Sequence, residues 1–253
     1  MKLQDYLLRY MEYCFHETMK QVYSSPEYLM EPDSQALILD CGCNNGAYAN
    51  YLGNRLGAQA VYGIEINRLL ANQARGNNIR VVQADLNGYW PFQSNSLSII
   101  TAFNLLEHLV ETQRFISELY RVLRPGGYAI INTPNLASWH NIVALLLGMQ
   151  PFSGPNITSM TESDVPIVRR MHRRAYNLPE ELEYIETGEP ERHRHIVVVA
   201  YKGIINALRR TGFSVVHALG FGYYPFPPTL ARLASQIDPT HAHHMVIKVC
   251  KVI

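Results

Sequence analysis

Residues 36–52, ALILDCGCNNGAYANYL, constrain the fold of this 253-residue chain more than any other stretch. An apolar run ends at Asp40, a turn containing two glycines follows, and the residues from Ala47 onward are typical of a helix. Gly42 and Gly46 lack a Cβ atom, so the main chain can approach a ligand closely at both positions. Such a turn also places backbone N–H groups at the start of a helix. The stretch therefore predicts the first strand–turn–helix unit of an α/β fold.

Three further predicted strands also lead to a polar residue. The strand AVYGIE ends at Glu65, IRVVQA leads to Asp85, and LSIITAFN ends at Asn104. The carboxyl ends of parallel strands share one edge of the sheet, where open α/β folds bind their ligands. A carboxylate at the offset of Glu65 from the glycine turn can accept hydrogen bonds from ribose hydroxyls. Asp85 is the next side chain along the edge that could reach an adenine.

These motifs together resemble the class I S-adenosylmethionine-dependent methyltransferases, and within them the small-molecule enzymes with an LEHL-type fourth strand end. The resemblance covers residues 36–135, including RVLRPGGYAIINTPN, and residues 202–251. It implies a doubly wound, mostly parallel seven-stranded sheet of the Rossmann-like methyltransferase type. In that fold the last strand, here MVIKVCKV, runs antiparallel between strands five and six. It also implies S-adenosyl-L-methionine as the cofactor.

The resemblance assigns cofactor contacts to ten residues at the strand ends. The methionine part would be held by Asp40, Gly42 and Gly46, and the ribose by Glu65. The adenine would contact Asp85 and Leu86, and Asn104 would lie beside the sulfonium. Further cofactor-binding neighbours would be Cys43, Ile66 and Leu105. One position departs from the family pattern, because Asn44 replaces the middle glycine of the turn. Asparagine tolerates left-handed backbone better than most residues, so the turn can still form.

Histidine is the natural general base for a hydroxyl acceptor near neutral pH. The candidates are His108, which follows Glu107 after the fourth strand, and His193 and His195 in ERHRHI, where the resembled group often carries a pocket histidine. A structural role competes with each assignment. His-x-His could also ligate a metal, but zinc needs three or four convergent ligands, and nothing in the sequence fixes their convergence. No metal site is therefore predicted.

The pattern along the chain divides it into three parts. Residues 1–35 contain an amphipathic helix and form a predicted N-terminal helical cap, which could pack on the domain, pack on a partner subunit, or cover the cofactor. Residues 36–135 and 196–253 form the predicted cofactor-binding domain. Residues 136–195, with a helix candidate at NIVALLLGM, form a predicted substrate-facing insertion after strand five.

Composition limits the setting in which the protein works. A formal charge of +1 argues against a protein whose main work is binding nucleic acid. There is no run of eighteen apolar residues, so no membrane span is expected, and no secretory signal is recognised. Four scattered cysteines indicate a reduced, cytoplasmic location. A homodimer is compatible with the sequence.

Several functions compete for this pattern. A nicotinamide-dependent oxidoreductase is disfavoured, because the turn GCNNG lacks the G-x-G-x-x-G spacing and no Tyr-x-x-x-Lys pair occurs. A nucleic-acid amino-methyltransferase would carry an Asn- or Asp-Pro-Pro-aromatic turn where this chain has NLLE. A catalytically silent cofactor-binding subunit stays open. The sequence favours methyl transfer to a small or carrier-borne acceptor, at oxygen rather than at nitrogen or carbon.

Overall fold

The computed structural model describes residues 3–156 and 194–252. The chain divides into two compact units, and each is described by itself. The helical unit comprises Met1–Tyr23, Pro134–Tyr201 and Leu219–Met245. The sheet unit comprises Ser24–Thr133, Lys202–Ala218 and Val246–Ile253.

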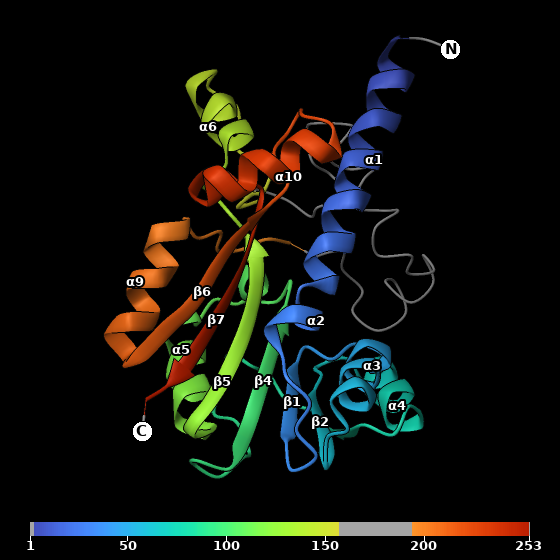
Figure 1. Ribbon diagram of the computed structural model, residues 1–253, viewed down its shortest axis with the longest axis vertical. Coiled ribbons are helices and arrows are strands. Elements are labelled where there is room, and N and C mark those ends of the chain that lie inside the picture. The colour runs from blue at the N-terminus through green and yellow to red at the C-terminus, as the bar shows by residue number, and fades with distance from the viewer. Residues whose placement is uncertain (1–2, 157–193, 253) are drawn as a thin grey trace. The chain divides into compact units, whose positions relative to one another are not determined.

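The sheet unit is built on a seven-stranded sheet with the order β3-β2-β1-β4-β5-β7-β6. Its strands are β1 (Leu37–Cys41), β2 (Ala60–Ile64), β3 (Arg80–Val82), β4 (Leu97–Phe103), β5 (Leu123–Pro134), β6 (Phe213–Phe221) and β7 (His244–Lys251). The pairs β1–β2, β1–β4, β2–β3 and β4–β5 are parallel. The last strand lies between β5 and β6, as predicted, and its arrow in Figure 1 points opposite to that of β5. The predicted doubly wound, mostly parallel sheet is confirmed.

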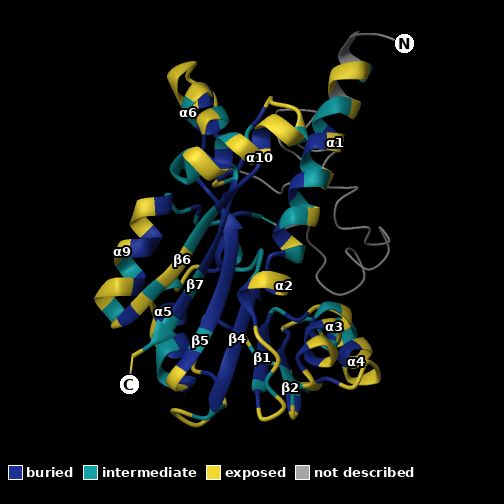
Figure 2. Cartoon of the chain, viewed as in Figure 1, coloured by how far each residue is buried: buried dark blue, intermediate teal, exposed yellow. Residues whose placement is uncertain are grey.

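The central strands are mostly buried (Figure 2): β4 is buried from Leu97 to Ala102, and β5 from Ala129 onward. Ile38, Leu39, Ile99 and Ile100 are almost completely buried, as are Ile130 and Ile131. Near-continuous apolar runs of this kind are what a parallel sheet covered on both faces requires. This core fixes the register of the strands, and so it fixes where the polar residues at their carboxyl ends stand.

The helices of the sheet unit are α2 (Pro26–Leu29), α3 (Ala47–Leu56), α4 (Arg68–Gly76), α5 (Thr112–Val122) and α9 (Tyr201–Thr211), with a 3₁₀ turn η1 (Leu106–His108). In α5 the residues Phe115, Ile116, Leu119 and Val122 form the buried face that the sequence pattern predicts. In α4 the N-cap Asn67 accepts hydrogen bonds from the backbone of Leu69 and Leu70 at 2.9 and 3.1 Å.

The RPGG segment differs from the expected loop. We expected strand five to begin at Tyr128, after a sharp reversal of the chain at the glycines. The strand instead begins at Leu123, where it pairs with Leu97, and the next paired residues are Ile99 and Tyr128. Two residues of β4 therefore oppose five of β5, so Pro125 and its glycine neighbours form an irregularity within the strand. A bulge accommodates extra residues in this way without ending the pairing.

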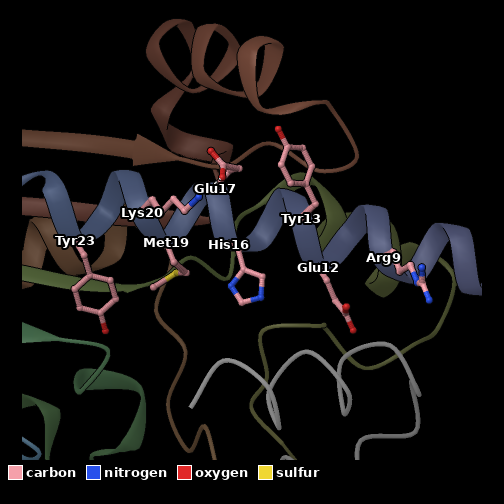
Figure 3. Close-up of a pocket in the computed structure, with 8 residues that line it drawn as sticks. All are labelled: Arg9, Glu12, Tyr13, His16, Glu17, Met19, Lys20 and Tyr23. Atoms are coloured by element: carbon pink, nitrogen blue, oxygen red, sulfur yellow. Dashed lines mark hydrogen bonds and ion pairs between the residues drawn. The ribbon is translucent and has the colours of Figure 1, made fainter. Parts of the chain in front are cut away.

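The helical unit contains α1 (Leu3–Ser24), α6 (Trp139–Leu146), α10 (Pro228–Ile237) and a 3₁₀ turn η4 (Pro239–His241). The predicted N-terminal helix is confirmed, and it packs on the segment before α10. The hydroxyl of Tyr10 donates to the carbonyl of Pro225 at 2.9 Å. A groove of about 790 Å³ runs along α1 and is lined by Arg9, Glu12, Tyr13, His16, Glu17, Met19, Lys20 and Tyr23 (Figure 3).

Asn135 holds the helical unit together at its centre. Its side-chain amide donates to the carbonyls of Thr240 and Ala242, both at 2.8 Å. Its side-chain oxygen accepts from the backbone of Ala137 and of Tyr201, both at 3.0 Å. A single buried amide thus joins the start of α6, the start of α9 and the segment before β7, and none of its side-chain hydrogen-bonding atoms goes unused.

Candidate functional site

The turn after β1 has the left-handed backbone that its sequence predicts. Gly42, Asn44 and Gly46 have φ angles of 70°, 50° and 78°, so Asn44 adopts the conformation for which the resembled family uses glycine. A Cβ atom on Gly46 would lie 2.9 Å from the Cα of Ala74 and 2.8 Å from a side-chain carbon of Ile79. Only glycine fits at Gly46, because packing and backbone angle both exclude a side chain.

Cys43 anchors this turn to the neighbouring strand. Its thiol is buried, and a Cβ atom on Gly63 of β2 would lie 2.4 Å from its sulfur. The backbone N–H groups of Gly42 and Cys43 both donate to the carbonyl of Ile64, at 2.9 and 3.1 Å. Cys43 and Cys41 are free thiols, as expected, and burial raises the pKa of both.

Glu65 stands at the end of β2 and receives two backbone donors. One carboxylate oxygen accepts from the N–H of Asn44 at 3.0 Å, and the other accepts from the N–H of Asn67 at 2.8 Å. The side chain is almost fully buried. The carboxylate is therefore held against both the glycine turn and the start of α4. Two fixed carboxylate oxygens beside such a turn suit a vicinal diol, which is what the ribose of an adenosyl group presents.

Asp40 is a buried carboxyl at the end of β1. The hydroxyl of Thr101 on β4 donates to it at 2.6 Å. Burial raises the pKa of Asp40 to about 7; the Thr101 hydrogen bond opposes this shift and the nearby charge of Glu65 adds to it. A carboxyl in this state gains most from a cationic partner.

Asp85 and Leu86 occupy the loop after β3. Asp85 is exposed, and its carboxylate accepts from the backbone and the side-chain amide of Asn87, both at 2.9 Å. Leu86 is buried. The side chain of Asn87 accepts from the backbone N–H groups of Val110 and Glu111 at 2.9 and 3.0 Å, which joins this loop to the segment before α5. The loop thus places a buried apolar side chain next to an exposed carboxylate.

Asn104 directly follows β4 and has a left-handed φ of 48°, and its N–H donates to the carbonyl of Asn132 at 3.1 Å. Leu105 follows, and its side chain lies 3.1 Å from where a Cβ of Gly42 would stand. The ends of β1 and β4 are therefore in contact. Glu65 is linked to the same turn through Asn44, and Asp85 follows the neighbouring strand. Ile66 is exposed beside Glu65.

Glu107 is a polar residue of this edge to which sequence reasoning gave no role. It lies in η1 with 1% of its surface exposed, and the hydroxyl of Thr133 donates to its carboxylate at 2.9 Å. Burial raises its pKa to about 7, against the lowering effect of hydrogen bonds from its own backbone and from Thr133. The acidic residue of the LEHL motif was visible in the sequence, but its burial was not. His108 follows it and is half-buried.

Of the other two histidine candidates, only His195 is among the residues that the structure describes. His193 lies outside the described residues. His195 belongs to the helical unit, where its ring is buried and its Nδ1 lies 2.6 Å from the carbonyl oxygen of Ser153. A carbonyl oxygen only accepts, so Nδ1 carries the proton and Nε2 is the basic nitrogen. The ring is thus fixed in one tautomer. Its catalytic role stays a prediction, as do the roles of the ten strand-end residues.

Comparisons with known proteins agree with this geometry. The family described as "Methyltransferase domain" matches residues 39–131. A probable S-adenosylmethionine-dependent methyltransferase of Mycolicibacterium smegmatis is 26% identical over 182 residues, covering 72% of this chain and 62% of that protein. A probable tocopherol O-methyltransferase of Oryza sativa subsp. japonica is 32% identical over 104 residues, covering 38% of this chain and 28% of that protein. The matched region therefore spans less than two thirds of either relative.

A crystal structure of an S-adenosylmethionine-dependent methyltransferase from Mesorhizobium loti has the same fold, with a TM-score of 0.55 and 19% identity over 90% of this chain and 97% of that one. The order and direction of the strands define a Rossmann-like fold. Residues 39–131 therefore match a methyltransferase domain, and the chain is similar in sequence and in fold to S-adenosylmethionine-dependent methyltransferases.

Proposed function

We propose that this protein transfers the methyl group of S-adenosyl-L-methionine to an oxygen of a small or carrier-borne acceptor. The observation that carries the proposal is the pair of buried carboxyls, Asp40 and Glu65, at adjacent strand ends around a left-handed glycine turn. The choice of oxygen is supported by the rice relative, whose name describes a tocopherol O-methyltransferase. A homodimer and a cytoplasmic location stay predictions.

The residues of the sheet unit fit the parts of this cofactor. Glu65 would accept from the ribose hydroxyls, Asp40 would face the ammonium of the methionine part, and the turn would pass close to it because Gly42 and Gly46 carry no side chain. When bound, the cofactor supplies a methyl group already activated on a sulfonium. The protein then has to align the acceptor and exclude water, which contributes up to about 7–11 kcal/mol to lowering a barrier.

A hydroxyl acceptor must also lose its proton. His195 suits this step, because its Nδ1–H donates to the Ser153 carbonyl and its Nε2 is left as the basic atom. His108 and His193 are the alternatives, and a general base contributes about 10²–10⁴-fold. We propose that residues 1–35 and 136–195 select the acceptor.

Calorimetric titration with S-adenosylmethionine and with S-adenosylhomocysteine tests the cofactor assignment. The Glu65→Gln variant should bind both at least about tenfold more weakly, since a hydrogen bond to a charged group contributes about 1.5–3 kcal/mol. The Glu31→Gln variant makes the same chemical change at an exposed residue before β1 and should bind like the wild type. Binding of a nicotinamide dinucleotide in place of either ligand would contradict the proposal.

Transfer of labelled methyl groups to a panel of hydroxyl, amine and carbon acceptors tests the reaction. We expect label to appear on hydroxyl acceptors and the His195→Asn variant to lose its rate enhancement at pH 7 while binding the cofactor normally. Transfer to amines alone would replace the oxygen assignment with nitrogen. Cofactor binding without transfer to any acceptor would support the silent-subunit alternative.

A further inference from the structure

The end of α6 exposes large apolar side chains to solvent. Residues 139–150 contain no Asp, Glu, Lys or Arg. Leu146 and Leu147 are 81% and 70% exposed, and Val143, Leu145 and Met149 are exposed as well. Scattered exposed leucines are normal on a protein surface, but a continuous apolar segment is not.

The exposed residues go round the helix rather than along one face. Successive residues of an α-helix are rotated by about 100°, so Leu145, Leu146 and Leu147 together span about 200° of its circumference. The end of the helix is held in a defined shape. Gly148, with φ 73°, donates to the carbonyl of Leu145 at 3.0 Å, and Met149 donates to that of Ala144 at 2.8 Å. These are the two hydrogen bonds of a Schellman motif.

The same helix is firmly anchored at its other side. The side-chain amide of Asn141 is buried; it donates to the carbonyl of Asn135 at 3.0 Å and accepts from the N–H of Ser153 at 3.1 Å. A buried polar anchor with both functions satisfied fixes α6 on the helical unit. The apolar end is therefore a built surface that projects from a rigid base.

A second apolar face belongs to α10. Leu230, Leu233 and Ile237 are exposed at a spacing of three and four residues, which places them on one side of the helix. A polar network ties the two helices together. The indole N–H of Trp139 donates to the hydroxyl of Tyr223 at 2.9 Å, and that hydroxyl donates to Asp238 at 2.6 Å. Figure 2 shows both helices with much of their length exposed.

We propose that the exposed end of α6 (Val143, Leu146 and Leu147) and the exposed face of α10 (Leu230, Leu233 and Ile237) together bind the interfacial layer of a lipid bilayer. A protein partner covers one side of a helix, whereas lipid surrounds it, and the end of α6 is apolar around more than half of its circumference. Charge agrees with this choice. In residues 139–150 and 226–237 the single charged side chain is Arg232, and the acidic residue that follows, Asp238, accepts from the Tyr223 hydroxyl at 2.6 Å and lies 2.7 Å from His241.

The aromatic residue at the base of α6 also fits this position. Trp139 is 45% exposed, with its N–H satisfied by Tyr223. Tryptophan with a polar end and an apolar body is enriched at membrane–water interfaces. None of the described helices is long and apolar enough to cross a membrane.

Flotation with phosphatidylcholine vesicles tests the proposal on the full chain. We expect the wild type to float with the vesicles and the variant Leu146→Gln/Leu147→Gln to partition at least about tenfold more weakly, because two leucine side chains no longer leave water. The control Val216→Gln/Val252→Gln places the same neutral side chain at two exposed valines elsewhere and should float like the wild type. Thermal melting checks that both variants are folded.

Brominated lipids give an independent reading. The chain has two tryptophans, and Trp90 is buried in the sheet unit. Quenching of fluorescence therefore reports Trp139, and we expect it in the wild type but not in the leucine variant. A wild type that stays in the aqueous fraction would overturn the proposal. A dimer in the absence of lipid that the leucine variant converts to monomers would also overturn it, in favour of contact between two copies of this chain.

Discussion

Replacing Asp40 by asparagine should remove a pH dependence from cofactor binding. Asp40 is buried beneath the glycine turn, and burial raises its pKa to about 7 despite the hydrogen bond from Thr101. If its carboxylate faces the cofactor's ammonium, binding requires the ionised form. A protein in which Asp40 is protonated must first lose that proton, so apparent affinity falls as the pH drops below 7.

The magnitude follows from the pKa. For a group of pKa about 7 that must be ionised, apparent affinity falls by about fifteenfold between pH 7 and pH 5.5, or about 1.6 kcal/mol. The cofactor's α-amino group titrates only near 7.7–8.0, so it stays charged over this interval. The Asp40→Asn variant keeps the shape of the side chain and the contact with Thr101. We therefore expect it to bind about tenfold or more weakly at pH 7, with little change down to pH 5.5.

Calorimetric titration with S-adenosylhomocysteine at several pH values measures both effects, because this product keeps the ammonium and lacks the sulfonium charge. The Asp33→Asn variant makes the same change just before the opposite end of β1 and should retain the wild-type dependence of affinity on pH.

The stability of the Asp40→Asn variant provides a second test. Because the pKa of Asp40 is raised in the folded protein, the stability that its protonated form contributes is present at low pH and lost as the pH rises through about 7. The Asp40→Asn variant should therefore have a higher unfolding free energy than the wild type at pH 8. Equal affinity and equal slope in the variant would refute this account of Asp40.

Three further predictions concern stability, measured by urea unfolding. Glu107→Gln should raise the unfolding free energy at pH 8 by on the order of 3 kcal/mol and leave it unchanged near pH 4. The reason is that the pKa of Glu107 is raised to about 7, so the stability that the protonated side chain contributes is lost as the pH rises through that value. Equal stability of variant and wild type at pH 8 would contradict this. Gly63→Ala should destabilise the protein by about 1–3 kcal/mol, since the new Cβ would lie 2.4 Å from the Cys43 sulfur. Adding Cys43→Ala should recover part of the lost unfolding free energy. If the effects of the two substitutions were strictly additive, the contact would be excluded. Burial, reinforced by nearby His140, lowers the pKa of His244 to about 3, so the stability that neutral His244 contributes is present above about pH 6.5 and is lost as the pH falls. The His244→Gln variant should therefore lose less unfolding free energy than the wild type between pH 7 and pH 5. An equal loss in both proteins would count against this.

The sequence predicts those parts of the fold that depend on local backbone chemistry and on the period of apolar residues. The turn after β1 could be predicted because Gly42 and Gly46 need left-handed angles, and Asn44 adopts one as well. The α5 helix was predictable from its single apolar face. The position of β7 between β5 and β6 came from the resemblance to a family and not from the residues themselves.

What could not be predicted depends on contacts between distant residues. Nothing near Glu107 in the chain shows that it is buried, because its partner Thr133 lies 26 residues away. The burial of His244 likewise follows from its place at the start of β7, within the sheet. The RPGG segment was taken as a reversal because proline and glycine signal turns, yet pairing with β4 on both sides keeps it within the strand.

The sheet order also determines when this sheet can be completed during synthesis. Among the described strands β6 lies at the edge of the sheet and pairs only with β7, which follows it in the sequence. A ribosome therefore releases β6 well before the strand that will hold it has emerged. Until then this strand has unpaired backbone groups along both sides, which is the state in which nascent chains associate with one another or recruit chaperones.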